Sequence, residues 1–168
     1  MPIALVRVDN RLIHAKVIEG WLPIIRANHI IIANNTIAID SMHQALLKLA
    51  TPPNVKLSFL TIKDAVEAIN FNKFPNDRIL VLVKDLQDML SMVEMGCVLE
   101  SINIGGLYYS SGKVEVARNV YLDDKDVEIL KKISSRGIKL EVRALPMDTK
   151  LDIMDIVIKN WDRLRGRS

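Results

Sequence analysis

A histidine and an aspartate lie close together near the start of the chain, with basic residues beside them, in the segment RVDNRLIHAKV. His14 offers a ring nitrogen that can act as a nucleophile, and Asp9 offers a carboxylate that can accept the ring N–H and fix its tautomer. Arg11 carries a planar fork of donors suited to phosphate oxygens, and Lys16 adds a positive charge. These residue types predict phosphoryl chemistry, with His14 as the catalytic residue and Asp9 as the residue that orients it.

The position of His14 along the chain supports this prediction. An apolar run of strand length ends shortly before it, and a helical pattern begins beside it. A helix start presents free N–H groups and the positive end of its dipole, and strand ends are where open α/β sheets bind ligands. We therefore expect Arg11, Lys16 and the backbone amides of Ile13 and Ala15 to bind phosphate. The alternative interpretation is a histidine merely satisfied by hydrogen bonds, among ordinary surface ion pairs.

Segments with strand and helix patterns alternate along the chain. The predicted strands are 3–8, 30–32, 55–60, 78–83, 101–104, 114–120 and 138–142, and the predicted helices are 13–25, 39–50, 61–70, 85–95, 123–136 and 148–161. Such alternation with short connections predicts an α/β fold that is doubly wound, with a mostly parallel, twisted, open sheet and helices on both faces. We expect residues 1–160 to form a single domain and the basic tail, 161–168, to fray.

The composition is that of an ordinary globular domain. The chain has 168 residues, of which 49% are hydrophobic and 26% are charged. Its single cysteine, Cys97, excludes an internal disulfide and points to a reducing cytoplasm. No apolar run reaches the ~18 residues that a membrane-spanning helix needs.

The net charge of +3 permits an anionic partner without requiring one. A nucleic-acid-binding module could use Lys131, Lys132, Arg136, Lys139 and the basic tail. Only 5% of the residues are aromatic, so stacking platforms for bases are few, and the helical lysines are better interpreted as a solvated face. We therefore expect no nucleic acid among the partners.

The sequence lacks the motifs by which nucleotide and metal enzymes are recognised. It has no Walker-A loop, and no G-x-G-x-x-G follows the first predicted strand. His29 and His43 have no metal-ligand spacing to His14, so we expect neither a metal nor another cofactor. The pair Gly105-Gly106 predicts either a tight turn at a strand end or backbone that passes close to a ligand beside His14.

The segment around His14 resembles the phosphoacceptor segment of the enzyme IIB components of the bacterial sugar phosphotransferase system, mannose/fructose/sorbose type. Four further segments resemble this family in the same order and spacing, so the resemblance covers about residues 1–158. They are TPPNV (51–55), INIGGL (102–107), GIKLEVR (137–143) and KLDIMD (150–155).

The resemblance implies a phosphorelay. In it, His14 takes a phosphoryl group from a phosphohistidine of a IIA protein and passes it to a sugar at the IIC/IID membrane transporter. It implies no nucleotide or metal cofactor, and a cytoplasmic location with association to the membrane through that transporter. It also implies that the loop with Asn103, Gly105 and Gly106 lies beside the histidine.

Two departures from the family pattern bear on function. The family has Gly-Gln directly after its histidine, whereas this chain has Ala15-Lys16, and a cation in the first helical turn opposes the helix dipole. We therefore hypothesise that Lys16 contacts the phosphoryl oxygens and stabilises phospho-His14. Ser110-Ser111 occupies a loop where relatives often carry a basic residue, which leaves the docking partner open.

A regulatory phosphohistidine carrier without a sugar acceptor is a second hypothesis that the sequence leaves open. Sugar specificity and oligomeric state are not encoded in it, and an oligomer is compatible with it.

Overall fold

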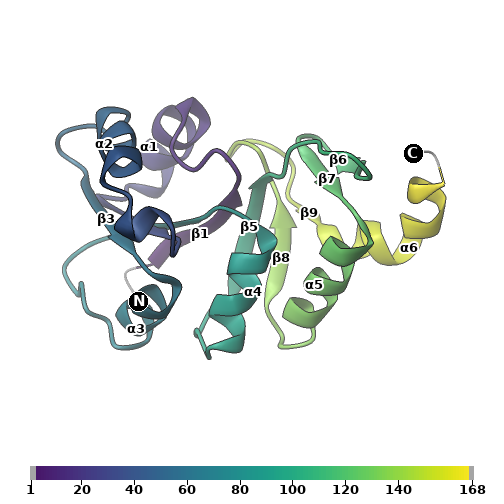
Figure 1. Cartoon of the computed structure of the whole chain (residues 1–168). Helices are drawn as coiled ribbons and strands as arrows, with labels where there is room; N and C mark the ends of the chain where they lie inside the picture. Colours follow the sequence, from purple (N-terminus) through teal and green to yellow (C-terminus); the bar gives the residue numbers. More distant parts are fainter. Residues whose placement is uncertain (1–2, 167–168) are drawn as a thin grey trace.

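The computed structural model describes residues 3–166 of the chain, and the two residues at each end lie outside the described part. Within residues 3–166, seven strands form one sheet in the order β3-β2-β4-β1-β5-β8-β9 (Figure 1). Neighbouring strands are parallel, except that β9 runs antiparallel to β8. The strands of this sheet are β1 (Ile3–Asp9), β2 (His29–Ala33), β3 (Lys56–Leu60), β4 (Ile79–Val83), β5 (Ser101–Gly106), β8 (Lys139–Val142) and β9 (Leu151–Asp152).

The composition of β2 and β4 explains their central place in this sheet. Every residue of both strands is buried, and both are rich in β-branched or leucine side chains, which suit a strand covered on two faces. Alternate residues belong to opposite faces, so Ile31 and Val81 pack in one core cluster while Ile30 and Leu82 pack in the other.

Helices cover both faces of the sheet, as the doubly wound prediction requires. One core cluster joins the sheet to α3, α4, α5 and α6, and the other joins it to η1, α1, η2 and α2. In Figure 1 the helices α4 and α5 lie in front of β5 and β8. The helices are η1 (Lys16–Trp21), α1 (Leu22–Ile25), η2 (Ile37–Ile39), α2 (Ser41–Leu49), α3 (Ile62–Asn70), α4 (Leu86–Glu94), α5 (Asp124–Ser134) and α6 (Ile153–Arg165).

Two predicted elements differ from the structure in the second half of the chain. The single strand predicted over 114–120 is a hairpin of two antiparallel strands, β6 (Val114–Ala117) and β7 (Val120–Leu122). Asn119 adopts a left-handed conformation with φ 62° between them, so the chain turns where the apolar pattern gave no break. The short strand β9 was not predicted, because two exposed residues carry no strand pattern.

The final helix also differs from the prediction. It begins at Ile153, after the N-cap Asp152, rather than at 148. It continues through 161–165, which were expected to fray, because Trp161 Nε1 and Arg165 Nη1 both donate to Asp124 Oδ1. The end of the predicted tail, 167–168, lies outside the described residues.

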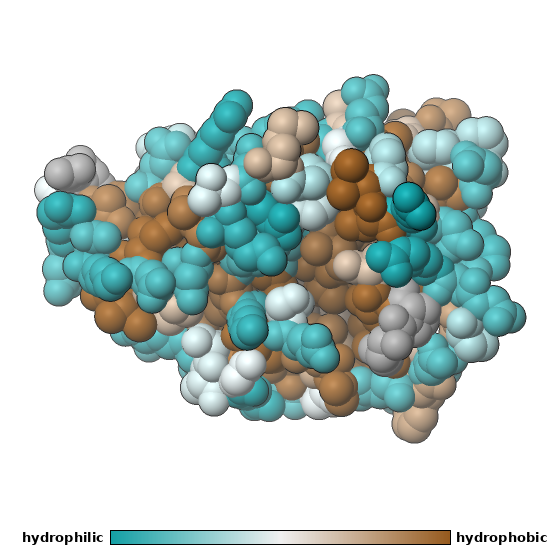
Figure 2. Space-filling view, turned by 180° about the vertical axis from the view of Figure 1, so that it is seen from behind, coloured by the Kyte–Doolittle hydropathy of each residue, from teal (hydrophilic) through white to brown (hydrophobic). Residues whose placement is uncertain are grey.

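The face seen from behind in Figure 2 exposes apolar surface in the middle of the view, between more polar borders. A groove of about 710 Å³ lies over the amino-terminal ends of β1, β5 and β8. Its lining combines apolar residues such as Leu5 and Leu99 with charged ones such as Lys139, Glu141 and Arg143. Among residues 3–166, no helix is long and apolar enough to span a bilayer.

Candidate functional site

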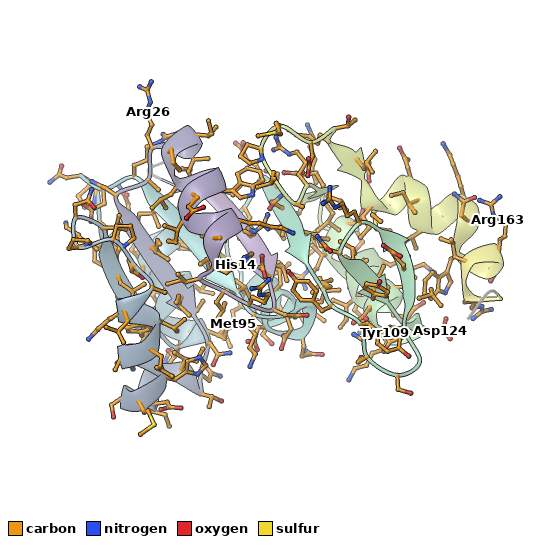
Figure 3. All side chains as sticks on the ribbon, turned by 90° about the horizontal axis from the view of Figure 1, so that it is seen from above. His14, Arg26, Met95, Tyr109, Asp124 and Arg163 are labelled. Carbon is orange, nitrogen blue, oxygen red and sulfur yellow. The ribbon has the colours of Figure 1, made fainter. Side chains whose placement is uncertain are left out.

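His14 lies at the point where the connections of the sheet change direction. The chain leaves β1 by a helix on one face and moves towards β2, whereas it leaves β5 by α5 on the opposite face and moves towards β8. The carboxyl ends of β1 and β5 therefore border the crevice in which doubly wound sheets bind ligands. Figure 3, viewed from above, shows His14 near the middle of the molecule, beside the helical segment that follows β1.

The loop between β1 and the helix has an unusual backbone. Leu12 is buried and adopts φ 56°, a left-handed conformation that few residues other than glycine accept. The helix then begins as a π-helix, η1, rather than the α-helix predicted over 13–25, and the His14 carbonyl accepts the N–H groups of both Val17 and Ile18. Such π-turns are frequent at functional sites, and a strained backbone conformation like that of Leu12 persists only where the surroundings enforce it.

This loop leaves several backbone donors free. Within residues 3–166, no hydrogen bond uses the N–H of Ile13, His14, Ala15 or Lys16. These N–H groups lie at the start of a helical segment, where the helix dipole favours negative charge. The arrangement is chemically suited to an anion beside the imidazole, and phosphate binding by the amides of Ile13 and Ala15 stays a prediction.

Asp9 and His14 are in direct contact, as the sequence predicted. His14 Nε2 lies 2.8 Å from Asp9 Oδ2. A carboxylate only accepts hydrogen bonds, so the proton of a neutral ring sits on Nε2 and the lone pair on Nδ1. Only 8% of the His14 side-chain surface is accessible, while the neighbouring Arg11 and Ala15 are exposed. The ring is thus mostly covered by its neighbours but lies close to the protein surface.

Asp9 is completely buried and is held as an anion. Its Oδ2 also accepts from Arg7 Nη2 at 3.0 Å and Arg7 Nε at 3.3 Å, and its Oδ1 accepts from the Arg11 N–H at 3.0 Å. Burial by itself raises the pKa of Asp9, but the hydrogen bond from His14 and the charge of Arg7 outweigh it, and the pKa lies below its usual value. Asp9 therefore stays ionised and keeps its accepting role towards the imidazole.

The two predicted cationic side chains are not in contact with the ring. The Arg11 guanidinium lies 5.9 Å from the centre of the Tyr108 ring and is exposed. Lys16 is half-buried, and within the described residues its ammonium has no hydrogen-bond or ion-pair partner. Both side chains are long and start within three residues of His14, so a phosphoryl group on the ring lies within their reach.

Gly105 and Gly106 are part of strand β5, so the expectations of a tight turn and of a loop are both wrong. Their backbone passes close to Arg7 and Asp9, and its approach to a ligand stays a prediction. Gly106 pairs with Asp9, and its carbonyl accepts the Asn10 N–H at 2.8 Å. A methyl group at Gly105 would overlap the Arg7 guanidinium. Both glycines therefore lie beside Asp9 and Arg7, whereas Asn103 contacts Arg7 and is linked to the His14 ring only through Arg7 and Asp9.

The sequence analysis missed a buried polar network beneath the site. Arg7 Nη1 donates to Asn103 Oδ1 at 2.7 Å, and Asn103 Nδ2 donates to Glu141 Oε1 at 3.0 Å. Glu141 in turn forms a two-point ion pair with Arg143. The available signal was that each of these strands carries a polar residue between apolar neighbours, at Arg7, Asn103 and Glu141. Their adjacency depends on the order β1-β5-β8, which no local pattern reveals.

Asn10 and Trp21 were also missed. Asn10 joins two loops at this edge, since its Nδ2 donates to the Lys84 carbonyl at 2.7 Å and its Oδ1 accepts the Tyr108 N–H at 2.9 Å. The guanidinium groups of Arg7 and Arg143 both lie over the Trp21 ring, with their carbons 5.4 and 5.0 Å from its centre. Trp21 thus ties the π-helix to the buried network.

The other buried histidine is far from this edge. His29 begins β2, at the amino-terminal end of the sheet, and contacts Asp77 Oδ2 at 3.0 Å and Ser58 Oγ at 2.7 Å. Burial lowers the pKa of His29 below its usual value. Across residues 3–166, no group of three or more His, Cys, Asp or Glu side chains is arranged to hold a metal ion.

Fold and site together define an open α/β domain with a histidine at the switch point, oriented by a buried aspartate and flanked by free amides. Comparison with known proteins agrees with this class. Residues 3–166 match the family model of the PTS system sorbose subfamily IIB component, and the chain belongs to this family. The predicted family resemblance and fold class are confirmed.

The relatives include one protein about twice as long as the matched segment and others of nearly the same length as this chain. The chain is 35% identical over 159 residues to the PTS system mannose-specific EIIAB component of Escherichia coli (strain K12), covering 95% of this chain and 49% of that protein. It thus spans about half the length of that relative. It is 31% identical to the PTS system sorbose-specific EIIB component of Klebsiella pneumoniae, covering 92% of this chain and 94% of that protein. The crystal structure of the IIBSor domain of the sorbose permease from Klebsiella pneumoniae matches with a TM-score of 0.86 and 30% identity, over 95% of this chain and 98% of that one.

Proposed function

We propose that this chain is a phosphocarrier that accepts a phosphoryl group on Nδ1 of His14. One observation carries the proposal: the contact between His14 Nε2 and Asp9 Oδ2, at 2.8 Å, assigns the ring proton to Nε2 and the lone pair to Nδ1. A neutral imidazole with a fixed tautomer is a competent nucleophile. Membership of the sorbose IIB family supports the same chemistry.

The transfer is a substitution at phosphorus between two histidines. The Nδ1 lone pair of His14 forms the new N–P bond while the bond between phosphorus and the donor nitrogen breaks, and the electron pair of that bond stays with the donor ring. Asp9 stabilises the positive charge that develops on the His14 ring through its hydrogen bond to Nε2–H. A phosphohistidine is itself an activated donor, so the step needs no nucleotide.

The charge on the phosphoryl oxygens needs stabilisation during transfer, and we assign this to groups around the ring. The N–H groups of residues 13–16 have no hydrogen-bond acceptor within residues 3–166 and lie in the loop and first turn of the π-helix, next to the ring. Arg11 leaves its place beside Tyr108, and Lys16 approaches from the first helical turn. Arg11 supplies a planar two-point contact, whereas Lys16 supplies a point charge.

The partners follow from the family. We infer that a IIA protein is the phosphodonor and that a sugar held by a IIC/IID membrane transporter is the final acceptor, because relatives that match along the whole chain are sugar-specific IIB components. The chain would then work in the cytoplasm and meet the membrane through its transporter.

The decisive experiment follows the phosphoryl group by mass. The chain is incubated with phosphoenolpyruvate, the general relay proteins and the cognate IIA protein, and its intact mass is measured. The wild type and the His43→Ala control, whose histidine lies on α2, should each gain one phosphoryl group that is labile to acid and stable to base. His14→Ala should gain none. Phosphorylation of His14→Ala, or none in the wild type, would overturn the proposal.

A second step separates the two carrier hypotheses. Purified phosphoprotein is mixed with vesicles containing the IIC/IID transporter and candidate sugars. Loss of phosphate from the protein with formation of sugar phosphate supports the sugar-transport function. A phosphoprotein that keeps its phosphate with every sugar and transporter offered supports a regulatory carrier instead.

A further inference from the structure

We propose that Arg7 is the positioning residue of this site. It is the end, next to Asp9, of a chain of polar contacts across three strands that runs through Asn103 to Glu141, here called the brace. This inference rests on the proposed function, since it assigns a role in preparing His14 for phosphorylation. Arg7 makes no contact with the His14 ring; it acts on the ring through Asp9, which both of them contact.

The burial and the contacts of Arg7 are those of a fixed group. Its side chain is completely buried. Val6 and Val8, its neighbours along β1, are buried in a core cluster on the opposite face of the sheet. The Nε and Nη2 of Arg7 donate to Asp9, while its Nη1 donates to Asn103 and to the Arg143 carbonyl. A guanidinium fixed at both ends of its plane can hold a carboxylate in one orientation, which an ammonium cannot do.

Asn103 has its amide orientation fixed by its partners. Its Oδ1 faces Arg7, which can only donate, and its Nδ2 faces Glu141, which can only accept. Glu141 is fixed in turn by its two-point pair with Arg143. The hydrogen bonds that run from Glu141 through Asn103 and Arg7 to Asp9 therefore have only one possible set of donors and acceptors. These bonds cross from β8 through β5 to β1.

The space around Arg7 is equally specific. Gly105 on β5 leaves room for the guanidinium, because a methyl group there would occupy its place. Trp21 also packs against it, with its ring centre 5.4 Å from the guanidinium carbon, and its Nε1 donates to the Ala144 carbonyl at 2.9 Å. The same carbonyl accepts Arg7 Nη2 at 3.2 Å. The π-helix that follows His14 thus contacts Arg7 through Trp21 and shares the Ala144 carbonyl with it.

The consequence for the reaction concerns the tautomer. Asp9 accepts from the His14 ring only in the orientation and charge state that Arg7 enforces. If the guanidinium moves, Asp9 can rotate or lose its alignment, and the ring can place its proton on Nδ1. That nitrogen would then have no lone pair for the phosphoryl group, so the rate of phosphorylation falls with the population of the wrong tautomer.

Gly105→Ala tests this role by displacing Arg7 without removing a charge or touching the ring. Gly166→Ala is the matched control, because a methyl group at Gly166 meets only the carbonyl oxygens of α6. Two-bond ¹H–¹⁵N NMR spectra of the ring in mildly alkaline buffer report the tautomer of His14 without any phosphorylation. We expect the Nε2–H form in the wild type and the control, and a mixture of both tautomers in Gly105→Ala. We expect phosphorylation by the IIA protein to slow by about 10- to 100-fold in the same variant, as when a group that orients a reacting ligand is lost.

Two further variants keep the test decisive if alanine at 105 prevents folding. Asn103→Ala breaks the brace but leaves Arg7 its backbone acceptors, and Arg7→Lys keeps the positive charge without the planar fork. Both should show mixed tautomers and slower phosphorylation. Folded variants with the pure Nε2–H form and wild-type rates would overturn the role of Arg7. A wild type that shows the Nε2–H form but takes no phosphate would overturn the proposed function, and the effect of Arg7 on the tautomer would then be judged from the NMR spectra of the variants alone.

Discussion

Replacing Asp9 by asparagine removes the charge of a buried carboxylate and puts an NH₂ group in place of one oxygen, with almost no change in volume, so its effects follow from charge and hydrogen bonding rather than from packing. Either orientation of the new amide places an NH₂ group against donors: against the ring and the Arg7 guanidinium at Oδ2, or against the Arg11 N–H at Oδ1. The completely buried Arg7 also loses its counter-charge. Leaving one member of a buried ion pair unpaired typically costs ~3–5 kcal/mol of unfolding free energy.

The loss in phosphorylation rate, expressed as a free energy, should exceed the loss in unfolding free energy. With an amide beside it, the ring is no longer restricted to the Nε2–H tautomer, and loss of the orienting carboxylate in a comparable Asp–His pair costs ~10⁴-fold in rate. Urea unfolding followed by circular dichroism gives the stability, and the initial rate of phosphorylation by the IIA protein gives the activity. Asp40→Asn is the control, since Asp40 caps α2 and asparagine caps a helix equally well.

A double variant separates the two effects. Arg7→Met with Asp9→Asn removes both buried charges, so most of the lost stability should return while the rate stays low. If Asp9→Asn alone unfolds within ~1 kcal/mol of the wild type and accepts phosphate at the wild-type rate, the assignment of both the tautomer and the buried pair is wrong.

Three other predictions follow from particular residues. Lys16→Gln should shorten the lifetime of phospho-His14 by about two- to fivefold, the ~0.4–1 kcal/mol that an exposed ion pair contributes, and an unchanged hydrolysis rate would refute a contact between Lys16 and phosphate. Burial lowers the pKa of His29 below 6.5, so the folded state binds fewer protons than the unfolded chain, and the unfolding free energy should fall as the pH falls below about 6.5. Urea unfolding over this pH range should show a smaller fall for His29→Gln, and equal falls in both chains would contradict the assignment. Leu82→Ala should lower the unfolding free energy by ~2–5 kcal/mol without changing the tautomer of His14, because Leu82 is completely buried in the core cluster beneath α1 and α2.

Local patterns predicted most elements of the fold because each pattern reflects a local cause. The strand over 79–83 is apolar throughout because both of its faces are covered. Asp123 marks the start of α5 because its side chain accepts the Asp126 N–H in a capping box. The hairpin of β6 and β7 escaped prediction because its turn depends on Asn119 in a left-handed conformation, which asparagine tolerates but does not require. The π-helix after His14 escaped because its apolar spacing resembles that of an α-helix.

The sequence alone was enough to propose the reacting group and to predict its contact with Asp9. His14 and Asp9 lie five residues apart on one strand-to-helix connection, so their contact needs only that the connection forms. Their chemistry is a property of side-chain type, which is why the phosphoacceptor histidine could be proposed before the fold was known.

Only the tertiary structure decided what holds Asp9 in place. Asn103 reaches Arg7 from 96 positions away along the chain, and Glu141, 134 positions away, is linked to Arg7 through Asn103. Both contacts need a strand order that depends on how the helices pack on the two faces of the sheet. A buried guanidinium is stable only where acceptors surround it on every side, and such an enclosure is built by distant segments at once. No local pattern specifies that enclosure, because each strand contributes one polar residue whose purpose appears only when β1, β5 and β8 lie side by side.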